Sequence, residues 1–325
     1  MPSPLTSNPA DAFATFGEGR LLAALDDWLG ADPQLLQPFG RSDDAAVFKS
    51  LIPEGFCAVQ AADSLVYGLH FDDSAPAEAT AGKLLRRNLS DFAAMGATPE
   101  TALLTLFLGS GVSMKWLQAF FAGMRADCIR FSVTLAGGDV SGAPPGTFAA
   151  SLFLSGWAER PLPRGLARTG DVLWVSGRLG GSLRGAHLNF MPRLAEGQWL
   201  ARQRCITSAI DLSDGLASDL PKLIGTEAAA RLDLNAIPLS EAARASASKS
   251  GKSPLEHAFT DGEDYELAFV SDGQADASRF AQAWRGEFDT ELTCIGTVVS
   301  RDQTQAALLD AQGKPLPFAG GWEHR

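Results

Sequence analysis

The sequence predicts an α/β (α+β) protein whose 325 residues form two halves. Segments rich in β-branched and aromatic residues alternate with segments of helical periodicity along the chain. A polar stretch around 158–170, rich in proline and glycine, interrupts this alternation near the middle. We therefore expect a loose N-terminal tail over 1–15, a first domain over 16–158 and a second domain over 159–325.

The first half is expected to open with a helix over 18–29, where leucines recur at helical spacing and Gly30 ends the helix. The clearest helix covers 78–95, because its apolar residues share one face and Gly96 stops it. A further helix is expected over 112–127. Strands are expected at 56–62, 101–108, 131–136 and 147–157.

The second half repeats this alternation. Strands are expected at 171–176, 207–210, 265–270 and 292–299. Helices are expected at 182–190, 192–203, 216–224 and 276–285. The segment 243–251 is composed of small and polar residues, and we expect it to be mobile.

Composition excludes several classes of function. A formal net charge of -11 and a sequence pI near 4.9 give no general attraction to nucleic acid or to an anionic membrane. No apolar run is long enough to span a membrane, and the N-terminus lacks the features of a signal peptide. Four scattered cysteines without a C-x-x-C pair suit a reducing compartment. We expect a cytoplasmic protein that binds neither nucleic acid nor membranes.

The positions of the aspartates are the most informative feature. Each one follows an expected strand, lies in the turn after one, or lies near the end of a helix: Asp44, Asp63, Asp139, Asp211 and Asp91. Carboxylates gathered at loop ends repel one another unless a cation lies between them. Mg²⁺ characteristically joins one or two carboxylates to substrate phosphates, and no histidine or cysteine accompanies this set. The pattern predicts a site for Mg²⁺ and a polyphosphate.

Each element of the pattern also has a purely structural explanation. Asp91 can pair with Arg87 one turn back on the same helix. The sequence G-G-D at 137–139 can form a tight turn, and D-L-S-D-G at 211–215 can cap the helix that follows. The ordered set as a whole favours the magnesium site over these separate explanations.

Common nucleotide-binding and catalytic motifs are absent from the sequence. There is no G-x-x-x-x-G-K-[ST] phosphate loop, no H-R-D or D-F-G of a protein kinase, and no G-x-S-x-G of a serine hydrolase. Binding of a polyphosphate therefore requires a different arrangement of residues.

Several blocks, taken in order, resemble the thiamine-monophosphate kinase family. They are S-D-D-A-A-V at 42–47, D-S-L-V at 63–66, G-L-H-F at 68–71, N-L-S-D-F-A-A-M-G-A-T-P at 88–99, G-G-D at 137–139, D-L-S-D-G-L at 211–216 and G-E-D-Y-E-L at 262–267. The resemblance runs from about residue 16 to the C-terminus. It implies a fold like that of aminoimidazole ribonucleotide synthetase, in which an N-terminal ATP- and metal-binding domain pairs its sheet with that of a second subunit. The protein is thus expected to be a homodimer.

The resemblance implies direct, magnesium-dependent transfer of the ATP γ-phosphoryl group to thiamine monophosphate, which gives thiamine diphosphate and ADP. It implies no covalent phosphoenzyme and no single catalytic side chain, because phosphoryl transfer depends on positioning and charge neutralisation. The implied ligands of several Mg²⁺ ions are Asp44, Asp63, Asp91, Asp139, Asp211 and Asp214. The implied contacts with ATP are Gly138, Asp139, Arg164 and Ser213. The implied contacts with thiamine monophosphate are His70, Glu263 and Phe318.

The chain departs from the family pattern in places. F-G-R-S at 39–42 precedes Asp-Asp where the family has Gly-Ile-Gly, and Ala61 and Ala62 precede Asp63 where the family has Ser-Thr. The loss of a hydroxyl at Ala61 bears on how many metals the chain binds. Two alternatives stay open: another ATP-using enzyme of the same superfold, and a metal-dependent nucleotide-binding protein without activity.

Overall fold

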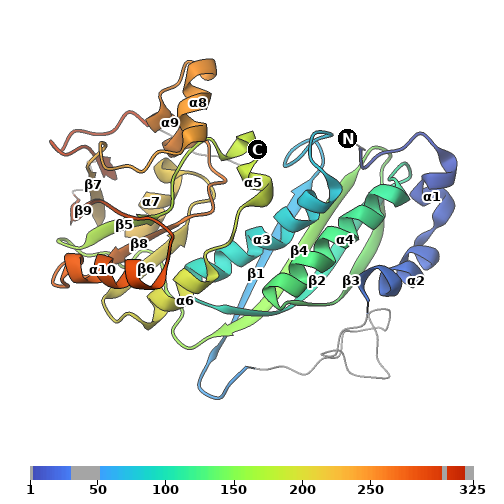
Figure 1. Cartoon of the computed structure of the whole chain (residues 1–325), viewed down its shortest axis with the longest axis horizontal. Coiled ribbons are helices and arrows are strands. Elements are labelled where there is room, and N and C mark those ends of the chain that lie inside the picture. Colours follow the sequence, from blue (N-terminus) through green and yellow to red (C-terminus); the bar gives the residue numbers. More distant parts are fainter. Residues whose placement is uncertain (1–2, 31–51, 302–305, 319–325) are drawn as a thin grey trace. The chain divides into compact units, whose positions relative to one another are not determined.

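The computed structural model describes residues 3–30, 52–301 and 306–318. The chain divides into two compact units, which are described separately below (Figure 1). Unit 1 comprises Met1–Leu89 and Thr98–Glu159, and unit 2 comprises Ser90–Ala97 and Arg160–Arg325. No helix in the described part of the chain is long and apolar enough to cross a membrane.

Unit 1 is built on a four-stranded sheet with the strand order β1-β4-β2-β3. Its strands are β1 (Cys57–Val66), β2 (Thr98–Gly109), β3 (Thr134–Ala143) and β4 (Phe148–Ala158). Strand β4 pairs antiparallel with both of its neighbours, whereas β2 and β3 are parallel. The helices are η1 (Pro9–Asp11), α1 (Phe13–Phe16), α2 (Glu18–Leu29), α3 (Ala77–Met95, whose last residues count with unit 2) and α4 (Met114–Phe131).

The two faces of the unit 1 sheet differ. Helices α3 and α4 cover one face, where Trp116 packs edge-on against Phe148 with ring centroids 4.8 Å apart (Figure 1). On the other face the period-2 alternation of the strands points Leu103, Phe107 and Phe153 outward, each 39 to 40% exposed. We call this second face the open face of unit 1.

Unit 2 contains a six-stranded sheet with the order β10-β7-β9-β5-β8-β6. Its strands are β5 (Val172–Ser176), β6 (Ile206–Asp211), β7 (Ala228–Leu232), β8 (Leu267–Ser271), β9 (Leu292–Ser300) and β10 (Leu308–Leu309). Its helices are η2 (Ser182–Arg184), α5 (Ala186–Asn189), α6 (Leu194–Arg202), α7 (Leu216–Ile224), α8 (Glu241–Ser250), α9 (Pro254–Thr260) and α10 (Ala277–Glu287). Each face of this sheet has its own apolar core, since Leu173 and Val175 belong to one cluster and Trp174 to the other.

Most of the expected elements are confirmed, and the helix over 18–29 has the predicted bounds. The helix expected over 182–190 is wrong as a single element, because Gly185, with φ +121°, separates η2 from α5. The segment 243–251, expected to be mobile, lies mostly in helix α8. The hydroxyl of Ser240 accepts the N–H of Ala243 and so caps this helix.

Two predicted strand ends are also wrong, and both bear on the site. Strand β1 continues to Val66, so Asp63 lies within the strand instead of just after it. Strand β3 runs from Thr134 to Ala143, so 137–139 form part of a strand and not a turn.

Candidate metal and phosphate site

In unit 1, Asp63 lies on the helix-covered face of the sheet. It pairs across strands with the fully buried Leu152. The guanidinium Nη2 of Arg87, from helix α3, lies 3.1 Å from Asp63 Oδ1. The Nη1 of Arg87 donates to the backbone oxygen of Ser64 at 2.8 Å. The side chains of Arg87 and Asp63 are only 11% and 25% exposed, so this is a largely buried ion pair.

Asp139 lies on the open face of the same sheet, at its opposite edge. It pairs with Thr105 of β2, which pairs in turn with Ser151 of β4. Its carboxylate accepts the hydroxyl of Ser141 at 2.8 Å. Asp63 and Asp139 therefore point to opposite faces and lie on the two edge strands, so unit 1 does not bring these two predicted ligands together.

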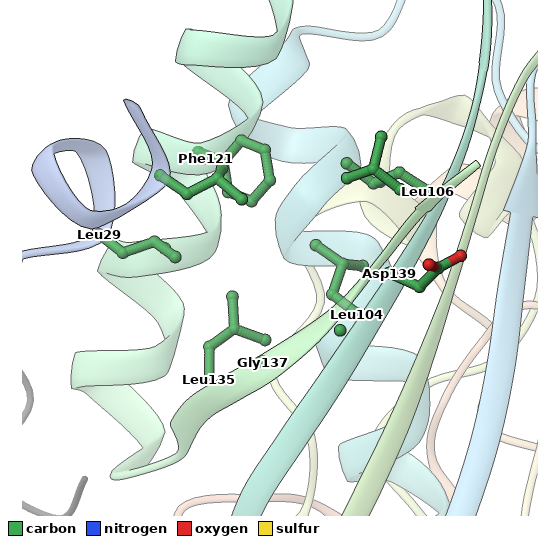
Figure 2. A pocket seen from close by; sticks show the side chains of 10 residues that line it. Leu29, Leu104, Leu106, Phe121, Leu135, Gly137 and Asp139 are labelled. Atoms are coloured by element: carbon green, nitrogen blue, oxygen red, sulfur yellow. The ribbon is translucent and has the colours of Figure 1, made fainter. Parts of the chain in front are cut away.

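Gly138 allows strand β3 to approach β2 closely. A Cβ atom at this position would lie 1.8 Å from the backbone oxygen of Leu104, so no other residue fits without moving the strands. Beside it is a small apolar cavity of about 40 Å³ between the sheet and helices α2 and α4, lined by Leu29, Phe121 and Leu135 among others. Figure 2 shows that the carboxylate of Asp139 points away from these side chains.

His70 lies in the turn that follows β1. Its Nδ1 accepts the N–H of Val66 at 3.1 Å, so the other ring nitrogen, Nε2, carries the proton of the neutral ring. The backbone oxygen of His70 accepts the ammonium of the fully buried Lys83 at 3.0 Å. These two hydrogen bonds hold the turn and fix the direction of the imidazole ring.

In unit 2, two segments that extend strands β6 and β8 carry most of the predicted residues. The N–H of Glu263 donates to the oxygen of Ser213 at 2.8 Å, and the N–H of Tyr265 donates to that of Leu212 at 2.9 Å. Gly262 permits this approach, because a Cβ there would lie 2.7 Å from the oxygen of Ser213. The structure therefore brings Ser213 and Glu263 side by side.

The backbone of the second segment is strained. Glu263 and Tyr265 have φ of 55° and 52°, a region that non-glycine residues rarely occupy. The ring of Tyr265 stacks on Phe190 with centroids 3.9 Å apart, and its hydroxyl donates to Glu263 Oε1 at 3.3 Å. Packing of Tyr265 thus supports the unusual backbone that presents Glu263.

The two predicted aspartates of the first segment are held differently. Asp211 is buried at the end of β6 and accepts the hydroxyl of Ser90 at 2.8 Å. Ser90 and the half-buried Asp91 belong to the last turns of α3. Asp214 lies before helix α7 and is 2.6 Å from the ammonium of Lys222.

Lys222 also contacts Asp219 at 3.0 Å, and Asp219 accepts the N–H of Asp214 at 2.8 Å. Burial raises the pKa of Asp219, although the hydrogen bond from Lys222 works in the opposite direction. Burial favours a lower pKa for Lys222, but its bonds to the two carboxylates outweigh this and raise the pKa. Sequence reasoning missed this cluster, although Lys222 follows Asp219 at the i, i+3 helical spacing.

Asp264 is a second carboxylate that sequence reasoning did not single out. The N–H of Gly180 donates to both of its oxygens, at 2.9 and 3.0 Å. Burial raises the pKa of Asp264 well above its usual value, and the nearby charges of Glu266 and Asp261 act in the same direction. Asp264 joins the segment 262–266 to the glycine-rich turn after β5.

The remaining predicted residues lie elsewhere. Arg164 is exposed on a segment anchored by the bond from the N–H of Gly165 to the oxygen of Leu223, at 2.8 Å. Phe318 stacks on Phe259 with centroids 4.4 Å apart and packs against a core cluster of unit 2. Asp44 lies outside the described residues.

Comparison with known proteins gives the family. The model of the family "AIR synthase related protein, N-terminal domain" matches residues 42–158. A thiamine-monophosphate kinase of Rhodopirellula baltica is 37% identical over 269 residues, which cover 81% of this chain and 84% of that protein.

Solved structures agree with this match. The thiamine-monophosphate kinase of Stenotrophomonas maltophilia superposes with a TM-score of 0.74 at 29% identity, covering 91% of this chain and 96% of that one. AaThiL complexed with AMPPCP and TMP gives a TM-score of 0.71 at 26% identity, with coverage of 94% and 96%. These matches confirm the predicted fold class, and the chain belongs to the thiamine-monophosphate kinase family.

Proposed function

We propose that this protein is a thiamine-monophosphate kinase that transfers the γ-phosphoryl group of ATP to thiamine monophosphate. The observation that carries the proposal is the paired segment of unit 2, in which backbone bonds of 2.8 and 2.9 Å hold Glu263 beside Ser213. Family relatives bear the same name, and one of them is solved with AMPPCP and TMP. The arrangement suits a reaction that depends on positioning more than on a covalent group.

The donor chemistry of the site fits Mg²⁺. The candidate ligands offer carboxylate and hydroxyl oxygens, which hard divalent ions prefer. Within the described residues no three acidic, histidine or cysteine side chains lie close enough to hold a metal by themselves. Mg²⁺ is commonly held by one or two carboxylates, and water and substrate phosphates complete its ligands. Bound Mg²⁺ would neutralise the charge that the polyphosphate carries.

We assign the metal-ligand role first to Asp211 and Asp214, whose β6–α7 segment also carries Ser213. Asp44, Asp91 and Asp139 remain proposed ligands of further ions, and Asp63 is considered separately below. Asp139 lies on the open face of unit 1, which is the face that a second copy of the chain is proposed to cover.

ATP is proposed to contact Gly138, Asp139, Arg164 and Ser213. Arg164 is exposed, and its fixed fork of N–H donors matches phosphate oxygens. The absence of a side chain at Gly138 lets β3 lie close to β2, which sets the position of the neighbouring Asp139.

The acceptor is proposed to contact His70 and Glu263. Thiamine carries a cationic thiazolium ring, which a carboxylate such as Glu263 can neutralise. His70 Nε2 carries the proton that we propose for an acceptor phosphate, and this nitrogen is buried in the structure. Phe318 stays a proposed aromatic contact with thiamine monophosphate. One face of its ring stacks on Phe259.

A homodimer is part of the proposal. Leu103, Phe107 and Phe153 form an apolar patch on the open face of unit 1, and a second copy of the chain would bury it. Sedimentation of the purified protein should give the mass of two chains, and Phe153→Lys should lower it to one. A wild-type mass of one chain at micromolar concentration would contradict this proposal. We also propose a cytoplasmic location.

The direct test is to incubate the full chain with ATP, Mg²⁺ and thiamine monophosphate and to measure thiamine diphosphate. Product should form, and EDTA should abolish it. Glu263→Gln should reduce the rate strongly, while the matched control Glu291→Gln, which alters an exposed ion pair with Arg178, should not. Turnover of ATP without thiamine diphosphate would contradict the proposed acceptor.

A further inference from the structure

The environment of Asp63 differs from that of the other predicted metal ligands. Its partner Arg87 is a guanidinium, which stays protonated at every pH that proteins tolerate. Arg87 reaches Asp63 from a buried position in helix α3 and is anchored a second time on the backbone oxygen of Ser64. This cation therefore has a fixed place and a permanent charge.

The residues next to Asp63 on β1 are poor partners for a hard divalent ion. Ala61 and Leu65 point to the same face of the strand as Asp63, and neither side chain offers oxygen. Ser64 points to the open face, where its hydroxyl lies 2.6 Å from that of Ser151.

A divalent ion on the carboxylate of Asp63 would lie within a few ångströms of the Arg87 guanidinium. At such a distance two positive charges in a largely buried environment repel strongly. Either the arginine moves, which breaks its bond to Ser64, or the ion is excluded. The second outcome keeps every hydrogen bond that the structure shows.

We propose that the guanidinium of Arg87 fills the cation position at Asp63, so that this carboxylate does not bind a divalent ion. The arginine supplies the positive charge that a bound metal ion would otherwise supply there. The inference rests on the proposed function only in treating Asp63 as one of the carboxylates that a kinase of this family would use for metal.

The first test counts metal ions directly. The full chain is titrated with Mn²⁺ in the presence of AMPPCP, and free Mn²⁺ is followed by electron paramagnetic resonance. Asp63→Asn should bind as many Mn²⁺ ions as wild type, with midpoints within about twofold. Asp211→Asn should lose an ion or weaken binding by at least about tenfold. Loss of an ion in Asp63→Asn overturns the proposal.

A second test does not depend on metal or on activity. The thermal midpoints of Asp63→Asn, Arg87→Gln and the double variant give a coupling between the two side chains. The coupling should exceed that of the exposed pair Arg178–Glu291 and resemble that of the buried pair Arg86–Asp127. Additive shifts in the double variant overturn the proposal.

These two tests separate the inference from the proposed function. If Arg87→Gln alone does not fold, the double variant should fold, because it no longer buries an unpaired carboxylate. If wild type binds no Mn²⁺ at all, the kinase assignment fails, while a strong coupling still supports Arg87 as the cation at Asp63.

Discussion

Asp63 in unit 1 and Asp214 in unit 2 each pair with a cation of this chain and are similarly exposed, at 25% and 26%, but the two cations differ. Arg87 and Asp63 are 11% and 25% exposed, and the guanidinium has a second anchor on Ser64. Lys222 is 40% exposed and holds Asp214 through an ammonium at the end of a flexible stem. The Lys222 ammonium is exposed and flexible, so it can turn away from Asp214 while it keeps its second contact, with Asp219 at 3.0 Å, whereas the Arg87 guanidinium is largely buried. The comparison therefore favours Asp214 over Asp63 as a proposed metal ligand.

The largest expected effect is on turnover. Asp214→Asn should lower kcat by about 10²-fold or more, because it removes a proposed metal ligand. The metal is proposed to stabilise negative charge in the transition state. Asp63→Asn should lower kcat far less, since the amide can still accept from Arg87. Steady-state rates of thiamine diphosphate formation at saturating ATP measure both variants. Equal losses in the two variants would remove the distinction between the pairs.

The next effect is on stability. Arg87→Gln leaves a largely buried carboxylate without its cation and should lower the free energy of unfolding by about 3 kcal/mol. The exposed control Arg178→Gln should change it by about 0.5 kcal/mol. Urea unfolding at neutral pH measures both. The comparison presumes that Arg87 stabilises Asp63 strongly. A small loss of stability in Arg87→Gln would contradict that premise.

Asp264 extends the comparison to a carboxylate that is held by the N–H of Gly180. Its pKa lies well above 3.8 in the folded protein, chiefly because of burial. The folded state thus holds this proton more tightly than the unfolded state does. The resulting stability is fully present below about pH 3.8 and is lost as the pH rises through the folded pKa.

Asp264→Asn keeps an oxygen that can accept from Gly180 but has no proton to lose. The free energy of unfolding of the variant minus that of wild type should therefore increase with pH across this window. Urea unfolding at a series of pH values measures the difference. A difference that does not change with pH would show that Asp264 has no raised pKa.

Sequence reasoning could predict the segments of this site better than the directions of their side chains. The order of the acidic blocks can be read directly from the sequence. The helix over 18–29 follows from the periodicity of its leucines. The face on which Asp63 lies depends on where β1 ends and on its register with β4, and a shift of one residue reverses it. For this reason the sequence could not show that Asp63 and Asp139 point to opposite faces.

The partner of Arg87 illustrates the same limit. Local spacing suggested Asp91, four residues on, and could not reveal the ion pair that Arg87 makes with Asp63 of a different element. Helix α8 was missed because small polar residues are typical of loops. Alanine is the strongest helix former, however, and Ser240 supplies the cap.

The smallest effect concerns Lys222. Because the ammonium is 40% exposed, Lys222→Gln should lower the free energy of unfolding less than Arg87→Gln does, although it removes the cation of the buried Asp219. Removing it also removes the cation that a metal at Asp214 would have to displace, so Mn²⁺ should bind at a lower concentration than in wild type. Titration with Mn²⁺ alone, without nucleotide, isolates this step, with Lys249→Gln on helix α8 as a control for net charge. Weaker binding of Mn²⁺ in Lys222→Gln would mean that the lysine supports the metal site, and the contrast with Arg87 would then be one of degree.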